Sequence, residues 1–229
     1  MNISNTSFNN IILDFDSKID SQADLEKVVL VAYQKSKNFF GKNVPGIKIS
    51  FLYQRSQIDK IRGYKTQDWE VAYAYGKENQ IFIFSPIVFD KVSNHPKSDF
   101  EYILTHEIAH LFSNKILGFS YPKWFCEGLA GYVAEQYKIR PVGEIDNFSD
   151  LHDKVSWDKF NNYPQAFSFT KYLIENLGKE RILKFLEDLG ERFGCCPNFK
   201  DFNEFFEDFF NINFKKLVSA WQKTIISQN

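Results

Sequence analysis

The chain has 229 residues, of which 44% are hydrophobic and 17% aromatic, and its net charge at pH 7 is −1. This length and composition describe a globular chain that needs neither a disulfide nor a metal ion merely to hold a core, and they exclude a disordered one. The near-zero net charge gives no basic surface for nucleic acid or an anionic membrane, so neither partner is expected.

The N-terminal residues and the cysteines give no indication of a secretion signal, a disulfide framework or a thiolate metal site. Residues 1–10 are polar, without the basic start and apolar run of a secretion signal, and no other stretch approaches the roughly 20 apolar residues of a membrane span. Cys126, Cys195 and Cys196 lack a C-x-x-C spacing, so neither a thiolate metal site nor a disulfide framework is indicated. We expect a cytoplasmic protein, with the reservation that a removed signal peptide leaves no trace.

The first elements in chain order alternate between strands and helices. An apolar run at residues 11–15 is a candidate strand, and Ser21 is placed to cap a helix that ends at Gly41. Residues 47–53 alternate apolar and polar side chains, which predicts a strand with one buried face, and a short helix is expected at residues 56–62.

Two further strands are predicted as a hairpin, at residues 69–75 and 80–85, joined by a turn at residues 76–79. An edge strand of this layer either holds an extended peptide by main-chain hydrogen bonds or serves as scaffold, and the sequence does not choose between the two. The pattern of the first strand places four large side chains on one face: Trp69, Val71, Tyr73 and Tyr75.

The pentad His106-Glu107-Ile108-Ala109-His110 has the pattern H-E-x-x-H. Ser98 and Glu101 resemble a capping box, and Gly118 suits a left-handed helix end, so a helix is predicted over residues 99–117. The two histidines lie one turn apart on it and can reach one metal ion, while Glu107 can take a proton from water on that metal. A single apolar arc is expected beside them, formed by Phe100, Ile103, Leu104, Ile108 and Leu111.

A third protein ligand for zinc must come from another part of the chain. Residues 122–132 predict a second helix, with Pro122 in its first turn and small residues at Gly128, Ala130 and Gly131 that permit close helix packing. Glu127 is the carboxylate best placed to join the histidines, whereas Glu135, further along, is expected to be an exposed helical glutamate.

Together, H-E-x-x-H at residues 106–110 and W-x-x-E-G-x-A at residues 124–130 resemble the gluzincin zinc metallopeptidases, within them the peptidase MA-like group of small thermolysin-type domains. The similarity extends over most of residues 45–228. It implies an α+β zincin-like fold, one catalytic Zn²⁺ held by His106, His110 and Glu127, and Glu107 as the catalytic glutamate that activates a metal-bound water. The substrate implied is a peptide or protein.

Several features of this sequence differ from those of known zinc metallopeptidase subfamilies. Only sixteen residues, 111–126, separate His110 from Glu127, fewer than in thermolysin or the large gluzincin aminopeptidases, and the G-x-M-E-N motif of those aminopeptidases is missing from the sequence. The metzincin pattern would need glycine at Ser113 and histidine at Ile116. We therefore expect an endopeptidase. Its specificity is expected to be narrow, because a general protease would be hazardous in a cytoplasm. The alternative is a peptide- or partner-binding protein on the same scaffold, with little turnover.

The oxyanion of peptide hydrolysis needs a donor besides the metal. Tyr163, placed in a loop at residues 161–164, is the first candidate because relatives in this group tend to carry a tyrosine at the equivalent place. The alternative is a structural tyrosine that packs at the entrance of the next helix. His152, in an acidic loop at residues 146–153, is the second candidate.

Four more helices are predicted, at residues 165–177, 179–189, 201–210 and 213–226. We expect a single zincin-like domain over residues 1–229, with an N-terminal α+β lobe at about 1–117 that holds a small mixed or antiparallel sheet and a C-terminal helical lobe at about 118–229. Oligomeric state leaves no mark on the sequence. Helical spacing of phenylalanines in the third of these helices indicates core packing: Phe202, Phe205, Phe206, Phe209 and Phe210.

Overall fold

The computed structural model describes the chain except residues 1–2, 120, 144, 146–161, 195–196 and 228–229. Within these residues it has eight α-helices and one five-stranded mixed sheet, which confirms the α+β class. The chain divides into two compact units, Met1–Phe112 and Ser113–Asn229, and each is described by itself. The expectation of one zincin-like domain stays a prediction.

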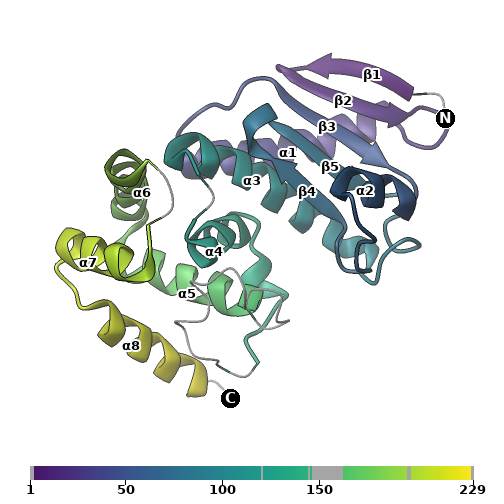
Figure 1. Cartoon of the computed structure of the whole chain (residues 1–229). Helices are drawn as coiled ribbons and strands as arrows, with labels where there is room; N and C mark the ends of the chain where they lie inside the picture. Colours follow the sequence, from purple (N-terminus) through teal and green to yellow (C-terminus); the bar gives the residue numbers. More distant parts are fainter. Residues whose placement is uncertain (1–2, 120, 144, 146–161, 195–196, 228–229) are drawn as a thin grey trace. The chain divides into compact units, whose positions relative to one another are not determined.

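The first unit is built on the sheet, whose strand order is β1-β2-β3-β5-β4 (Figure 1). The central strands β2 (Ile11–Asp16), β3 (Ile47–Leu52) and β5 (Gln80–Phe84) run parallel. The outer strands β1 (Ile3–Phe8) and β4 (Ala72–Tyr75) pair antiparallel with β2 and β5. The sequence did not predict β1, because its mostly polar residues give no apolar alternation.

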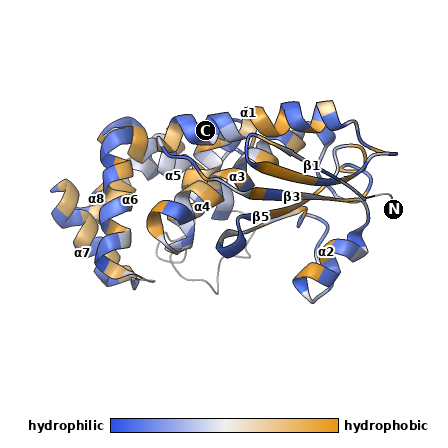
Figure 2. Cartoon of the chain, turned by 90° about the horizontal axis from the view of Figure 1, so that it is seen from above, coloured by the Kyte–Doolittle hydropathy of each residue, from blue (hydrophilic) through white to orange (hydrophobic). Residues whose placement is uncertain are grey.

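One face of the sheet forms the core of this unit. The register aligns Leu13 with Ile49 and Ile49 with Ile81, and all three side chains are fully buried. Helices α1 (Gln22–Phe40) and α2 (Arg55–Arg62) lie on opposite sides of the sheet (Figure 2). Helix α1 confirms the predicted caps, since Ser21 Oγ accepts from the amide of Asp24 and Gly41 adopts φ +68°.

The predicted strand at residues 69–75 is too long. Strand β4 begins only at Ala72, and Trp69 is 41% exposed whereas Val71 is 4% exposed, so these two side chains do not share one buried strand face. The reason is the guanidinium of Arg55, which donates to the carbonyls of Gln67, Asp68, Glu70 and Val92 and so holds residues 67–70 as a turn.

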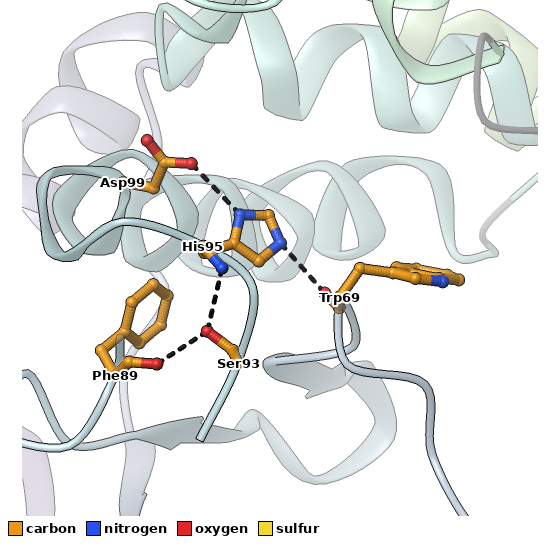
Figure 3. Close-up of polar contacts among 5 residues, drawn as sticks. All are labelled: Trp69, Phe89, Ser93, His95 and Asp99. Atoms are coloured by element: carbon orange, nitrogen blue, oxygen red, sulfur yellow. Dashed lines mark hydrogen bonds and ion pairs between the residues drawn. The ribbon is translucent and has the colours of Figure 1, made fainter. Parts of the chain in front are cut away.

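Helix α3 (Phe100–Leu117) begins in the first unit and follows a short 3₁₀ turn, Lys97–Asp99, so Ser98 lies inside that turn. His95 fixes its start: Nδ1 lies 3.1 Å from Asp99 Oδ2 and Nε2 lies 3.1 Å from the carbonyl oxygen of Trp69. Figure 3 shows the imidazole between these groups, with the Trp69 indole pointing away. The helix ends as predicted, with Gly118 at φ +81° and its amide donating to the carbonyl of Asn114.

The second unit is helical and contains α4 (Lys123–Val133), α5 (Asn162–Leu177), α6 (Lys179–Phe193), α7 (Phe199–Phe210) and α8 (Phe214–Ile226). The predicted end of α6 at Gly190 is wrong. Gly190 lies inside the helix, where an added Cβ would come within 2.8 Å of the Leu117 carbonyl oxygen, and the helix ends at Gly194 with φ +61°.

An aromatic core holds α6, α7 and α8 together. Phe202 and Phe206 are fully buried, and their rings contact Phe185 of α6 and Phe214 of α8 at centroid distances of 5.0–6.0 Å. This confirms the prediction that the phenylalanines of α7 pack in a core. Among the described residues, none of the helices combines the length and the apolar character that a membrane span requires.

Candidate metal centre

His106 and His110 converge because both lie on helix α3, one turn apart. The two Nε2 atoms are 2.9 Å apart, and the rings meet edge to face with centroids 4.6 Å apart. The His106 side chain is 7% exposed, and His110 is half-buried. Two ring nitrogens that face each other so closely suit a common ligand such as a metal ion.

Helix α3 is buried around most of its middle section. The predicted arc is confirmed, since Phe100, Ile103, Leu104, Ile108 and Leu111 are all less than 9% exposed. On other sides of the helix Thr105 and Ala109 are also buried, and Phe112 stacks on Phe40 of α1 at 5.9 Å. A helix held in this way keeps its histidines in one place, which a preformed metal site requires.

Glu127 comes from α4. Pro122 is the N-cap of this helix, and Trp124 and Phe125 in its first turn are fully buried and anchor it. One ligand atom from each of His106, His110 and Glu127 lies within 4.8 Å of the other two, and this is the one group of three or more such side chains found among the described residues. Two imidazole nitrogens and one carboxylate oxygen fit a divalent transition metal, of which several are compatible.

Glu107 and Glu135 differ in position. Glu107 is half-buried and adjoins His106 on α3, outside the group of three. The prediction that Glu135 is an exposed helical glutamate is wrong, because α4 ends at Val133 and Glu135 is half-buried. Glu135 adopts φ +59° beyond the helix end and its carboxylate pairs with Lys138.

The two candidates for the oxyanion donor have separate outcomes. Tyr163 does not lie in a loop as predicted, because α5 begins at Asn162 and includes it in the first turn. Its ring packs on Phe167 at a centroid distance of 6.2 Å, and Lys123 Nζ lies 5.8 Å from it. His152 lies outside the described residues. The catalytic role of either residue stays a prediction.

The small residues of α4 pack as predicted. A Cβ on Gly128 would lie 1.9 Å from Thr170 Oγ1, and a Cβ on Gly131 would lie 2.1 Å from the Phe167 ring. The sequence indicated close packing but not its partner, α5, because no local signal links these positions to Thr170 or Phe167.

A model of the family described as "Peptidase of plants and bacteria" matches residues 3–220. No curated protein matches the chain.

Proposed function

The chain belongs to the family of peptidases of plants and bacteria, and from this premise we propose that it is a zinc-dependent metallopeptidase of the gluzincin type. The zinc ligands in this proposal are His106, His110 and Glu127. The observation that carries it is the grouping of their three ligand atoms within 4.8 Å, in a chain whose family cleaves peptides.

Zinc is favoured over other divalent metals by the number and kind of ligands. Two histidines and one glutamate are the protein ligands of several catalytic zinc sites, which leave a fourth position open. Two nitrogens on a tetrahedral zinc ion lie about 3.3 Å apart, given Zn–N bonds of about 2.0–2.1 Å. The Nε2 atoms of His106 and His110 lie 2.9 Å apart, about 0.4 Å less than that value.

Zinc, when bound, would supply a Lewis acid that lowers the pKa of water to about 7 and polarises the peptide carbonyl. Glu107 adjoins His106 on the rigid helix α3, and it takes the proton of the attacking water and passes it to the leaving amine. The phenol of Tyr163 donates to the oxygen of the former carbonyl. Its position in the first turn of a long helix gives this phenol a stable support.

We propose endopeptidase action on a peptide or protein, since the sequence lacks the G-x-M-E-N motif of the gluzincin aminopeptidases. Narrow specificity is part of the proposal, because a general protease would be hazardous to the cell that makes it. The competing hypothesis is a peptide-binding protein with little turnover. A general base beside the metal favours the enzyme, because binding alone does not use one.

Metal content tests the ligands. Purified parent protein dialysed against metal-free buffer and then reconstituted should hold about one zinc per chain, and His106→Ala and Glu127→Ala should hold none. His95→Ala and Glu135→Ala are matched controls outside the group and should keep the metal. Zinc-free parent protein after reconstitution would refute the proposal.

Cleavage of a casein-type substrate tests turnover. Glu107→Gln should lose activity by about 10²- to 10⁴-fold, the usual contribution of a general base, with zinc retained. Glu101→Gln changes an exposed glutamate on the same helix and should keep full activity. Equal cleavage by Glu107→Gln and parent would remove the catalytic assignment, and a zinc-loaded parent without any cleavage would favour the binding protein.

A further inference from the structure

We propose that Thr170 and Ala166 of helix α5 position the metal ligand Glu127 by contact with Gly128, the residue that follows it in α4. Glu127 is the ligand assigned by the proposed function, so this inference rests on that function. Thr170 and Ala166 touch neither metal nor substrate in this proposal, and they act only through α4.

The contact leaves no space at Gly128. An added Cβ would lie 1.9 Å from Thr170 Oγ1, 2.9 Å from Thr170 Cβ and 2.7 Å from the carbonyl oxygen of Ala166. Gly128 does not have the left-handed backbone that favours glycine, and glycine inside a helix costs up to about 1 kcal/mol relative to alanine. Its presence is therefore explained by the close approach of α5 to the backbone beside Glu127.

The surface that Gly128 meets is stiff. It consists of a backbone carbonyl and a β-branched side chain, whose χ1 has few alternatives in a helix. The three atoms nearest to a Cβ added at Gly131 all belong to the ring of Phe167, which can turn as a side chain. A larger residue at position 128 would thus displace helix backbone, whereas one at position 131 would first displace a ring.

Helix α5 is itself held in the core of its unit. The Phe169 ring lies 5.4 Å from Trp124 and 5.2 Å from Trp221, and Trp221 Nε1 donates to Ser168 Oγ at 3.0 Å. Thr170 and Ala166 are fully buried. We infer that crowding at Gly128 moves α4 and, with it, Glu127.

In this proposal Thr170 acts through the shape of its side chain and not through a hydrogen bond of its hydroxyl. Its hydroxyl is buried and has no hydrogen-bond partner in the part of the chain that the structure describes. Valine has nearly the same shape and no hydroxyl, so Thr170→Val should preserve the position of α4. Metal sites respond to such positioning, since loss of supporting groups typically costs about 10- to 100-fold in affinity.

The test measures zinc affinity by competition with a chelator and the visible spectrum of the Co²⁺-loaded protein. Gly128→Ala should bind zinc at least about tenfold more weakly than the parent and change the Co²⁺ bands. Thr170→Val should stay within about twofold of the parent. Phe206→Leu removes packing in the aromatic core of α6, α7 and α8, and it should lower the thermal midpoint without a comparable loss of zinc affinity.

Folded Gly128→Ala with parental zinc affinity would overturn the proposal, as would an equal loss of affinity in Phe206→Leu. If Gly128→Ala does not fold, Thr170→Ala replaces it as the test variant. This substitution removes the side-chain atom of Thr170 that lies nearest to a Cβ added at Gly128, and it adds no atom. It should weaken zinc binding about three- to tenfold, and parental affinity would overturn the proposal. If the parent does not bind zinc, the proposed function is refuted as well. If the parent binds zinc but the α5 variants behave otherwise than expected, only the positioning role of Thr170 and Ala166 is refuted.

Discussion

The phenol of Tyr53 donates a 2.6 Å hydrogen bond to Oδ2 of Asp20. The phenol oxygen of Tyr53 accepts from the backbone amide of Asp16 at 2.7 Å, and Ser85 Oγ donates to Oδ1 of Asp20 at 2.8 Å. All four residues are less than 9% exposed. Tyr53→Phe should therefore lower the free energy of unfolding by about 1–3 kcal/mol, because it leaves a buried amide and a carboxylate with fewer partners.

Urea unfolding at pH 7 measures this loss, with Tyr64→Phe at a site 47% exposed as control. Burial and the hydrogen bond to Asp20 raise the pKa of Tyr53 above its ordinary value of 10. Stabilisation by a raised pKa is complete below about pH 10 and declines as the pH rises beyond it. The difference between parent and Tyr53→Phe should shrink above pH 10, and a constant difference would contradict the raised pKa.

An acid-side dependence is expected from Asp14. Burial acts to raise its pKa, but hydrogen bonds from Lys48, Asn5 and Ser50 and the charge of Lys48 outweigh burial, so the pKa is lowered. A lowered pKa stabilises the fold above the unfolded value of about 3.9, and this stabilisation is lost as the pH falls below it. Asp14→Asn should flatten the decline in stability between about pH 5 and 3, with a change below about 1 kcal/mol at pH 7 since Lys48 is 42% exposed.

Asp188→Asn provides the comparison for Asp14→Asn, because Asp188 pairs with Lys184 on the surface of helix α6. Equilibrium unfolding of the three proteins at several pH values checks the prediction. An acid decline in Asp14→Asn as steep as that of the parent would show that Asp14 does not contribute to it.

Arg55 should be the main support of the turn before β4. Its guanidinium donates to four backbone carbonyls and lies 4.9 Å from the centre of the Phe84 ring. Arg55→Met should lower the free energy of unfolding by at least about 2 kcal/mol and raise amide hydrogen exchange in residues 66–71. Arg62 lies on the same helix as Arg55, and its guanidinium stacks on the ring of Tyr73 in β4. Arg62→Met removes this stacking and should lower the free energy of unfolding by less than about 1 kcal/mol. Equal effects of the two variants would argue against the special role of Arg55.

The local features of this fold were predictable from sequence. Helix α1 carries a serine cap at one end and a left-handed glycine at the other, and helix α3 repeats apolar residues at helical spacing. The pairing of His106 with His110 belongs to the same class, because residues four apart on a helix are neighbours whatever surrounds them.

Contacts between distant segments were not predictable. The pattern at residues 69–75 alternates as a strand does, and nothing in it shows that Arg55 bends the chain at residues 67–70. Strand β1 is recognised only through its pairing with β2. In the candidate site, glycines indicated close packing of α4, but Thr170 was not identifiable because only the tertiary fold brings it to Gly128.

The oxyanion role predicted for Tyr163 is tested by Tyr163→Phe, which removes the hydroxyl and keeps the ring that packs on Phe167. The turnover number should fall by about 10²-fold, as on loss of one oxyanion donor, with zinc content unchanged. Tyr172→Phe, on the same helix and stacked on Phe169, is the control and should keep its turnover number. Parental activity in Tyr163→Phe would exclude the role.

Zinc should stabilise the folded chain, because the proposed ligands come from helices α3 and α4 and an unfolded chain does not hold them together. At free zinc about 1,000 times the dissociation constant, the gain is about 4 kcal/mol. For a chain of this size that raises the thermal midpoint by about 8–16 °C. Scanning calorimetry of the apo and zinc-loaded parent measures the shift, and chelator should reverse it.

His106→Ala should show no shift in the thermal midpoint. His95→Ala should show the parental shift, because His95 contacts Asp99 and Trp69 at the helix start and lies outside the ligand group. An equal shift in His106→Ala would mean that zinc binds elsewhere in the chain.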